Sequence, residues 1–235
     1  MNASTSAARH SIRILSYNLW HGRAQHEVAS LVETHDPDVV CLQEAQAHAL
    51  AHHIGGVELV AITPRNRLGL ALYARSTRFE VQSASAFPLS TSRHDRLVGG
   101  TDHRLVAARV RDRDADREVV LGSFHGTPFT DSNRFRRIQV DDAHHALTEL
   151  GPGLASLMAG DYNHPILLGM LRRHVKRRGF TLAFTATSTF HRDGNLMRGK
   201  FDLATASGLD VVDAVALPSG KSDHRPVLFT LQYSS

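Results

Sequence analysis

Short apolar runs separated by polar turns recur along the whole chain and predict many β-strands. The runs are rich in Val, Ile, Leu and Phe, and residues typical of turns bound them. We expect strands at Ile12–Tyr17, Val39–Leu42, Leu59–Ile62, Leu68–Tyr73, Phe79–Ala84, Leu105–Val110, Val119–Phe124, Leu154–Ala159, Phe201–Thr205, Val211–Ala214 and Val227–Leu231. The alternating charges of Arg111–Glu118 indicate an exposed hairpin tip between two of these strands.

Apolar residues at helical spacing predict three helices between the strands. The first covers His26–Thr34 and ends before Asp36-Pro37, because proline removes a backbone donor. The second covers Asp131–Leu150, where Gly and Pro residues follow as a stop signal, and the third covers Ile166–Arg178. Many strands with interspersed helices favour an α/β protein.

Composition indicates an ordinary globular protein. The chain has 235 residues, of which 42% are hydrophobic and 21% charged, without a linker, a low-complexity tract or a repeat. We expect residues 1–10 to be a flexible N-terminal segment and residues 11–235 to form a single domain. The one cysteine, Cys41, allows no internal disulfide, which fits a reducing compartment. Since neither a secretory signal nor a membrane span is visible, we expect a soluble, cytoplasmic protein.

The charge balance favours an anionic ligand without identifying it. The formal net charge is +4 with histidine neutral, and nucleic acid, a phosphorylated metabolite and an acidic lipid all remain open. The basic run Arg172–Arg178 could follow phosphates of a nucleic acid. It could also be the solvated end of a helix, where cations complement the dipole, and we favour this second interpretation. Aromatic residues do not interleave with the run, which weakens a case for base stacking.

Polar side chains recur where the predicted strands end. They are Asn18, Glu44, His125, Asp161, Asn163, Asp223 and His224. Because core packing fixes a buried strand while solvent reaches its end, a polar group there usually points into a cleft. We therefore expect the fold to gather these groups into one shared site.

The residue types in this set suit a metal-assisted reaction at phosphorus. Glu44, Asp161 and Asp223 supply carboxylate oxygens, and Asn18 and Asn163 add amide groups. Magnesium or manganese prefers such a site, completed by waters and substrate oxygens. The two imidazoles titrate near neutral pH and could act as acid, base or phosphate donor. Together these groups fit attack by water on phosphorus.

Each of these residues also has a purely structural interpretation. Glu44 could cap a helix over Ala45–His53, Asp161 and Asn163 could form a turn, and Asp223 could cap a loop. For each residue taken singly, the structural interpretation is about as well supported as a catalytic one. Taken together, the common placement at strand ends favours a shared site.

The remaining histidines carry weaker signals. His52-His53 and His144-His145 are adjacent pairs on predicted helices, where neighbouring residues do not share a face. Without a cysteine cluster, a structural zinc site is disfavoured. His21 and His164 adjoin the polar set, and each could line the cleft or lie in a solvated loop.

Five short motifs occur in an order that resembles the endonuclease/exonuclease/phosphatase family. They are Ser16-Tyr17-Asn18-Leu19-Trp20, Leu42-Gln43-Glu44, Ser123-Phe124-His125, Gly160-Asp161-Tyr162-Asn163 and Ser222-Asp223-His224. Each motif alone is weak, but the ordered set covers the chain from Ile12 to Leu231. The resemblance implies an α/β (α+β) fold, a four-layered αββα sandwich of two central mixed β-sheets flanked by helices. It also implies a cofactor, Mg²⁺ or Mn²⁺.

The resemblance further implies roles for the polar set. Glu44 would be the principal metal ligand, with Asn18 and Asp223 close to the metal or its waters. Asp161 would position and deprotonate the attacking water, and Asn163 would help to hold the phosphate and the nucleophile.

Two histidines complete the implied site. His224 would bind a phosphate oxygen and stabilise charge in the transition state. Asp202 matches the family's carboxylate that orients this histidine, which would favour a charged imidazolium. His125 would donate a proton to the leaving oxygen. Arg136 and Gln139 fit the family's Arg-x-x-Gln helix and are more structural than catalytic.

The chain departs from the family pattern in two places. The family usually has Thr-His-Leu where this chain has Phe124-His125-Gly126, and we expect Gly126-Thr127-Pro128 to reshape that loop. The sequence offers no clear carboxylate partner for His125. Leu203-Ala204-Thr205 follows Asp202 in place of the usual aromatic. Both departures bear on the roles of the histidines.

Three functional hypotheses follow. The first is a metal-dependent hydrolase of a phosphodiester, with DNA or RNA as the first substrate to test. The second is a phosphatase or phosphodiesterase for a small phosphorylated metabolite or a lipid head group, since one fold serves many substrates through its loops. The third, an inactive binding module, is disfavoured because Glu44, Asp161 and His224 are all present.

Overall fold

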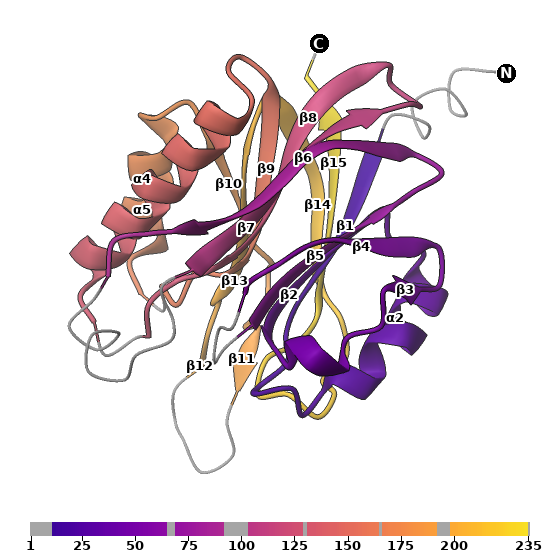
Figure 1. Cartoon of the computed structure of the whole chain (residues 1–235). Coiled ribbons are helices and arrows are strands. Elements are labelled where there is room, and N and C mark those ends of the chain that lie inside the picture. The colour runs from indigo at the N-terminus through magenta and orange to yellow at the C-terminus, as the bar shows by residue number, and fades with distance from the viewer. Residues whose placement is uncertain are drawn as a thin grey trace, which may run out of the picture.

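Two mixed β-sheets pack face to face at the centre of the structure, and helices cover their outer faces (Figure 1). The computed structural model describes residues 11–64, 69–91, 103–128, 131–164, 166–191 and 198–234. The predicted four-layered αββα sandwich is confirmed. The segment 1–10, predicted to be flexible, lies outside the described residues.

The first sheet has seven strands in the order β14-β15-β1-β2-β5-β4-β3. Their bounds are β1 (Ser11–Asn18), β2 (Val39–Ala45), β3 (His53–Ile54), β4 (Val57–Ile62), β5 (Gly69–Arg75), β14 (Leu209–Ala216) and β15 (Val227–Tyr233). β1 and β2 are parallel, and the other pairs are antiparallel. The helix α2 (Val28–His35) covers the outer face, and short 3₁₀ turns lie at Gln25–Glu27 (η1) and Ala47–Ala49 (η2).

The second sheet has six strands in the order β10-β13-β9-β8-β7-β6. Their bounds are β6 (Phe79–Pro88), β7 (His103–Asp112), β8 (Arg117–His125), β9 (Ala155–Asp161), β10 (Thr181–Ala183) and β13 (Asp202–Ser207). Its outer face is covered by α4 (Asn133–Leu150) and α5 (Leu168–Lys176). A separate pair, β11 (Phe190–His191) and β12 (Arg198–Gly199), lies at one end of the sandwich. No helix in the described part of the chain is long and apolar enough to span a membrane.

The alternation of side chains along a strand divides the core into layers. In β1, Ile12 and Ile14 point into the core between the sheets, whereas Leu15 and Tyr17 pack outward under α2. Because successive side chains point to opposite faces, a strand covered on both sides must be apolar at nearly every position. This explains why the strands that carry the candidate residues are continuous apolar runs in the sequence.

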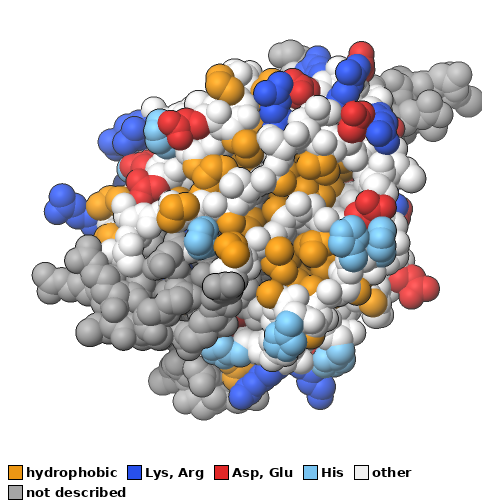
Figure 2. All heavy atoms as spheres, viewed as in Figure 1, with side chains coloured by type: hydrophobic (Ala, Val, Ile, Leu, Met, Phe, Trp, Pro, Cys, Tyr) orange, Lys and Arg blue, Asp and Glu red, His pale blue; other side chains and the backbone are white. Residues whose placement is uncertain are grey.

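The open edges of the two sheets form an apolar seam. Figure 2 shows apolar side chains gathered on this face over β4 and β6. A groove of about 370 Å³ lies between these strands, lined by residues that include Val60, Ile62 and Ala86.

The sequence missed the shortest strands and mispredicted one helix. The two-residue and three-residue strands β3, β10, β11 and β12 carry too few residues to show a period of two. The expected helix over Ala45–His53 is wrong: the chain makes a single 3₁₀ turn and then enters β3 at His53. Leu50 is the only large apolar side chain in this segment, and nucleation of a short helix is costly when little packing supports it.

His144 lies buried on the inner face of α4, where it belongs to a chain of hydrogen bonds. Its ring stacks on Phe180 at 3.6 Å, and its Nε2 lies 2.9 Å from Thr205 Oγ1. Thr205 Oγ1 is 2.9 Å from the Tyr162 hydroxyl, which donates to the carbonyl of Met158 at 3.0 Å. Since the Tyr162 proton is used on Met158, Thr205 donates to Tyr162, and the His144 Nε2–H donates to Thr205. His144 is therefore a neutral imidazole with its proton on Nε2.

We expect the free energy of unfolding of His144→Gln to fall less on acidification than that of wild type. Burial lowers the pKa of His144 to about 3 from its usual 6.5. Between these values the unfolded chain binds more protons than the folded one, so the free energy of unfolding falls as pH drops through this window. Urea unfolding across this pH range measures the slope. The exposed neighbour provides a control, His145→Gln, which should follow wild type, and a wild-type slope in His144→Gln would refute the assignment.

Candidate active site

The strand ends that carry the candidate residues meet at one end of the sandwich. Along the parallel pair β1–β2, Asn18 lies opposite Gln43, and along the parallel pair β8–β9, His125 lies opposite Asp161. In the antiparallel pair β13–β9, Asp202 also lies opposite Asp161. The two sheets thus bring residues that are distant in sequence to one edge.

Glu44 reaches this edge because β2 is irregular. The register of β2 against β5 shifts between Leu42 and Ala45, and Glu44 adopts φ 55°. Left-handed backbone is uncommon for any residue except glycine, and irregularities of this kind redirect a side chain. The Glu44 Oε1 atom consequently lies 3.5 Å from Asn18 Nδ2 and 3.8 Å from His125 Nε2.

Asp161 occupies the middle of the site. Its Oδ2 accepts a hydrogen bond from Asn18 Nδ2 at 3.0 Å, and its Oδ1 accepts one from the backbone N–H of Asn163 at 2.8 Å. The Nε2 atoms of His125 and His224 lie 3.6 Å and 3.7 Å from Oδ2. A buried carboxylate thus lies between an amide and two imidazoles.

His224 is held by a buried carboxylate and by aromatic rings. Its Nδ1 lies 2.9 Å from Oδ2 of Asp202, and the edges of Phe190 and Phe201 pack around the imidazole. Burial alone would lower the pKa of His224, but the charges of Asp202 and Asp161 outweigh it and raise that pKa to about 10. The imidazole is therefore protonated at neutral pH, and its Nε2–H faces Asp161.

The two carboxylates nearest the centre have pKa values displaced in opposite directions. Burial alone would raise the pKa of Glu44, but His125 and His21 outweigh burial and hold it below its usual range. Burial raises the pKa of Asp161 well above its usual range, against the opposing charge of His224. Displacement of this kind is typical of an acid–base site.

Asn163 and Gly126 join the loops after β9 and β8. Asn163 has φ 48° and donates from Nδ2 to the carbonyl of Gly126 at 3.1 Å. The Gly126 N–H donates to the carbonyl of Asp161 at 2.8 Å. A Cβ at Gly126 would lie 2.8 Å from the carbonyl oxygen of Tyr162. The glycine that departs from the family pattern therefore permits a close approach of two loops.

Asp223 is tied to the site through its backbone and its charge. Its carbonyl accepts a hydrogen bond from the His191 N–H at 2.9 Å, and its carboxylate contributes to the raised pKa of His224. The preceding Ser222 donates from Oγ to the carbonyl of Asn18 at 2.7 Å and accepts from the His224 N–H at 3.0 Å. The Ser-Asp-His motif is thus fastened to the end of β1.

His21 and His164, which the sequence left open, occupy different environments. The His21 N–H donates to Glu44 Oε2 at 2.9 Å, and its Nδ1 lies 3.5 Å from the same oxygen, so His21 lines the site. His164 is buried, so the solvated-loop interpretation is wrong for this residue. Within the described part of the chain, neither ring nitrogen of His164 has a hydrogen-bond partner.

Thr189 supports the site and was missed in the sequence. Its hydroxyl oxygen accepts hydrogen bonds from the N–H groups of Phe201 and Asp202 at 3.0 Å and 3.2 Å. Its carbonyl accepts from the Arg225 N–H at 2.7 Å. A lone threonine before a two-residue strand gives no recognisable pattern, so no sequence signal could have identified it.

A polar link between the sheets lies behind the site. Gln43 donates from Nε2 to Ser123 Oγ at 3.2 Å, and that hydroxyl donates to the carbonyl of Leu42 at 3.2 Å. Arg104 donates to the carbonyl of His125 at 3.1 Å. These contacts fix the ends of β2 and β8 relative to one another.

The Arg-x-x-Gln helix secures the loop after β8. Gln139 accepts from the Thr127 N–H at 2.8 Å and donates to the carbonyl of Ser90 at 2.8 Å. Arg136 donates to the carbonyl of Asp131. The contacts agree with a structural role for both residues.

The donor set fits a hard divalent cation beside Glu44. Among the described residues, Asp161, Asp202 and His224 offer ligand atoms within 4.8 Å of one another. Within this trio, the Nδ1 of His224 and Oδ2 of Asp202 already lie 2.9 Å apart in a hydrogen bond that orients the imidazole. Glu44 supplies carboxylate oxygens of the kind that Mg²⁺ prefers, with Asp161 adjacent. Asn18 turns its Nδ2 toward both carboxylates, while its Oδ1 accepts from the Trp20 N–H at 3.0 Å.

We expect Asp202→Asn to lower the pKa of His224 and to narrow the pH range of activity. Asp202 contributes the largest of the charges that raise this pKa, so its loss should leave the imidazole neutral at alkaline pH. Hydrolysis should then fall more steeply on the alkaline side than on the acidic side. Histidine NMR titration and a kcat–pH profile measure both effects, with Asp210→Asn as an exposed control. An unchanged His224 pKa would contradict the assignment.

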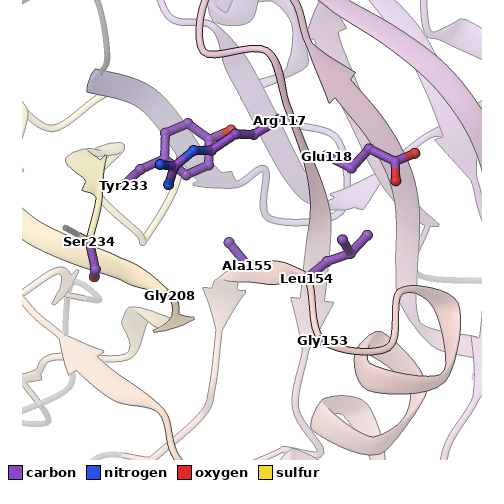
Figure 3. Close-up of a pocket in the computed structure, with 8 residues that line it drawn as sticks. All are labelled: Arg117, Glu118, Gly153, Leu154, Ala155, Gly208, Tyr233 and Ser234. Atoms are coloured by element: carbon purple, nitrogen blue, oxygen red, sulfur yellow. The ribbon is translucent and has the colours of Figure 1, made fainter.

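A separate pocket of about 420 Å³ lies at the other end of the sandwich (Figure 3). Its lining includes Arg117, Glu118, Leu154 and Tyr233 at the ends of strands remote from the site. The Arg117 guanidinium lies 5.5 Å from the centre of the Tyr233 ring. This lining contains no histidine and none of the candidate carboxylates, so it offers no comparable chemistry.

Comparisons with known proteins identify the family of the chain. The model of the Endonuclease/Exonuclease/phosphatase family matches residues 15–224. The search of curated proteins gave no match.

Solved structures of similar fold cover nearly the whole chain. An endonuclease/exonuclease/phosphatase family protein from Bacteroides thetaiotaomicron has a TM-score of 0.76 at 17% identity, covering 96% of this chain and 98% of its own. The mannosyl-6-phosphatase of the same organism has a TM-score of 0.71 at 17% identity, covering 94% and 100%. TDP2 of D. rerio, complexed with a single-strand DNA product, has a TM-score of 0.72 at 15% identity, covering 94% and 99%. At these identities the likeness shows the fold, whereas the family model rests on the sequence itself. The chain belongs to the Endonuclease/Exonuclease/phosphatase family, whose members are hydrolases that act on phosphate esters.

Proposed function

We propose that the protein hydrolyses a phosphodiester by in-line attack of activated water and depends on a divalent metal, Mg²⁺ or Mn²⁺. DNA or RNA is the first candidate substrate. The observation that carries the proposal is the position of Asp161, whose carboxylate lies beside Asn18 and between the Nε2 atoms of His125 and His224. We also propose that residues 11–235 act as one domain, since strands from both halves of the chain share the core between the sheets.

Glu44 would be the principal metal ligand, with Asn18 and Asp223 near the metal or its waters. When bound, the cation would polarise a phosphoryl oxygen and offset the charge that develops there. The lowered pKa of Glu44 supports this role, because a metal ligand must be ionised.

Asp161 would orient the attacking water and take its proton. The N–H of Asn163 fixes one carboxylate oxygen, which leaves Oδ2 facing the site. A raised pKa makes this carboxylate a stronger base than an exposed aspartate. The Asn163 side chain, held to the Gly126 carbonyl, would position the phosphate.

The two imidazoles would act on different oxygens of the phosphate ester. His224, protonated and oriented by Asp202, would donate to a non-bridging phosphate oxygen and stabilise its growing charge. His125 would deliver a proton to the leaving oxygen. Its Nε2 lies 3.8 Å from Glu44 and 3.6 Å from Asp161, so this nitrogen faces the centre where the leaving oxygen would lie.

The choice of substrate rests on charge. The positive net charge favours an anionic substrate, and the basic last turn of α5 supports a polyanion over a small monoester. The same fold carries a mannosyl-6-phosphatase, so a small phosphorylated metabolite is the second candidate.

The test compares hydrolysis of plasmid DNA, RNA and bis-p-nitrophenyl phosphate with Mg²⁺, Mn²⁺ or EDTA. The proposal predicts cleavage of a nucleic acid and of the small diester with metal and none with EDTA. Cleavage of the small diester alone would keep the catalytic proposal and remove nucleic acid as substrate. Failure on all three diesters under every condition would overturn the proposal.

A further inference from the structure

We propose that α5 and the first turns of α4 form a surface that holds the backbone of a nucleic-acid strand extending from the catalytic centre. This α4–α5 basic surface consists of Arg134, Arg137, Arg173, Lys176 and Arg177. The inference rests on the proposed function and deepens it by assigning the binding of a long polyanion to these side chains.

The two helices begin at the catalytic end of the sandwich. α4 and α5 follow the strand ends at His125 and Asp161, and the strands after them, β9 and β10, start at the opposite end. Ile166 follows Asn163 by three positions, so their Cα atoms are at most about 11 Å apart. A nucleic-acid strand that leaves the site along this side would pass the first turn of α5 and then reach the cations of its last turn.

The arginines of α4 lie on the side of that helix that faces α5. Asp141 marks this side, because its carboxylate lies 2.9 Å from His174 Nε2 and accepts from Arg178 at 3.2 Å. Arg137 and Arg134 precede Asp141 by four and seven residues, and residues at this spacing share a helix face. Both therefore flank the junction between the helices on its catalytic side.

The cations of α5 point away from the core. Leu171 and Val175 are buried against the sheet, whereas Arg173, Lys176 and Arg177 are exposed on the opposite side of the helix. Figure 2 shows Lys and Arg side chains at the left of the molecule, over the region where Figure 1 places these helices.

The charges of this surface are not neutralised within the protein. α5 contains no acidic residue, and among the residues that the structure describes the five cations have no carboxylate partner. Elsewhere, exposed arginines such as Arg109 and Arg111 do have one. A favourable helix dipole could account for cations at the end of α5 but not for Arg134 and Arg137, which lie near the N-terminus of α4, where the dipole disfavours positive charge.

An extended polyanion fits this arrangement. A helix of nine residues is about 13 Å long, whereas a DNA strand carries one phosphate per about 3.4 Å of helix axis. Contacts of this kind fix a backbone without reading its sequence. Ile166, Leu167 and Met170 are exposed at the start of α5, whereas Arg173, Lys176 and Arg177 lie at its C-terminal end. Because the apolar and basic side chains occupy opposite ends of the helix, the basic end favours a nucleic-acid strand over a membrane surface.

The test measures binding of fluorescein-labelled oligo(dT) by anisotropy in EDTA, over a series of salt concentrations. A variant combining Arg173→Gln, Lys176→Gln and Arg177→Gln should bind about 10-fold more weakly or worse. The slope of log Kd against log salt should fall by about 2, since each lost contact to a single strand removes about 0.7. With metal present, the KM for oligo(dT) should rise while hydrolysis of bis-p-nitrophenyl phosphate stays unchanged.

The matched control removes three cations at the opposite end, through Arg111→Gln, Arg113→Gln and Arg117→Gln, and should bind nearly as wild type. Equal weakening in both variants, or none in the α5 variant, would overturn the inference. Binding of α5 to phosphatidylserine vesicles in place of oligo(dT) would overturn it in favour of a membrane. If no ester is cleaved but oligo(dT) binding still depends on α5, the proposed function fails and this surface stands.

Discussion

Asp161→Asn should lower kcat for bis-p-nitrophenyl phosphate by about 10²- to 10⁴-fold, the range associated with loss of a positioned general base. The amide keeps the shape of the side chain and can still accept from the Asn163 N–H, but it cannot take a proton from water. KM should change little, because the phosphate contacts are left in place. Steady-state kinetics at saturating metal measure both constants.

The stability of Asp161→Asn provides a second readout. Burial disfavours the charged form of Asp161, whereas the amide can accept from only one of the two donors, the Asn163 N–H and Asn18 Nδ2. Because these two effects oppose each other, the melting temperature should change little. An exposed carboxylate on β14 gives the control, Asp213→Asn, which should keep the wild-type rate. A folded Asp161→Asn protein with nearly wild-type kcat would rule out Asp161 as the base.

Arg78→Met should reduce the free energy of unfolding by about 3–5 kcal/mol, the cost of leaving a buried charge without its partner. Arg78 is buried just before β6 and donates two hydrogen bonds to the carboxylate of Asp112, at 3.0 Å and 2.8 Å. It also donates to the carbonyl of Ser11 at 2.7 Å and pairs with Asp38 at 3.1 Å. The guanidinium thus joins the two sheets at the end remote from the site.

Urea unfolding measures this effect, and a double variant separates its causes. Replacing both partners, as Arg78→Met with Asp112→Leu, should recover part of the loss because no charge is then left buried alone. Arg111→Met removes an exposed ion pair and should stay near wild-type stability. A loss for Arg78→Met no larger than for Arg111→Met would show that the buried pair contributes little.

The sequence predicted the strand-end residues well because burial and chemistry are both local signals. A polar residue that ends an apolar run stands out, and Asn18, His125 and Asp161 were identified in this way. Packing then brings those ends together, as the pairing of His125 with Asp161 illustrates. Glycine is required before Asp161 because of a contact with a neighbouring strand: a Cβ at Gly160 would lie 1.9 Å from the carbonyl oxygen of Phe124.

Features that depend on several segments could not be predicted. Asp112 lies in a charged stretch that indicated an exposed hairpin tip; residues 113–116 do form a turn, but Asp112 is fully buried by its contact with Arg78. The carboxylates beside His125 come from other strands, so its own neighbourhood in the sequence gave no partner. The orientation of Glu44 depends on the irregular register between β2 and β5, which no local sequence pattern predicts.

The most direct test of the central claim is a metal titration of bis-p-nitrophenyl phosphate hydrolysis by wild type and Glu44→Gln after removal of metal with EDTA. The account predicts that stripped wild type is inactive and recovers with Mg²⁺ or Mn²⁺. Glu44→Gln should need much more metal for half-maximal rate, because it lacks the principal carboxylate ligand. Full activity in stripped wild type, or the same metal dependence in both proteins, would contradict a divalent-metal centre at Glu44.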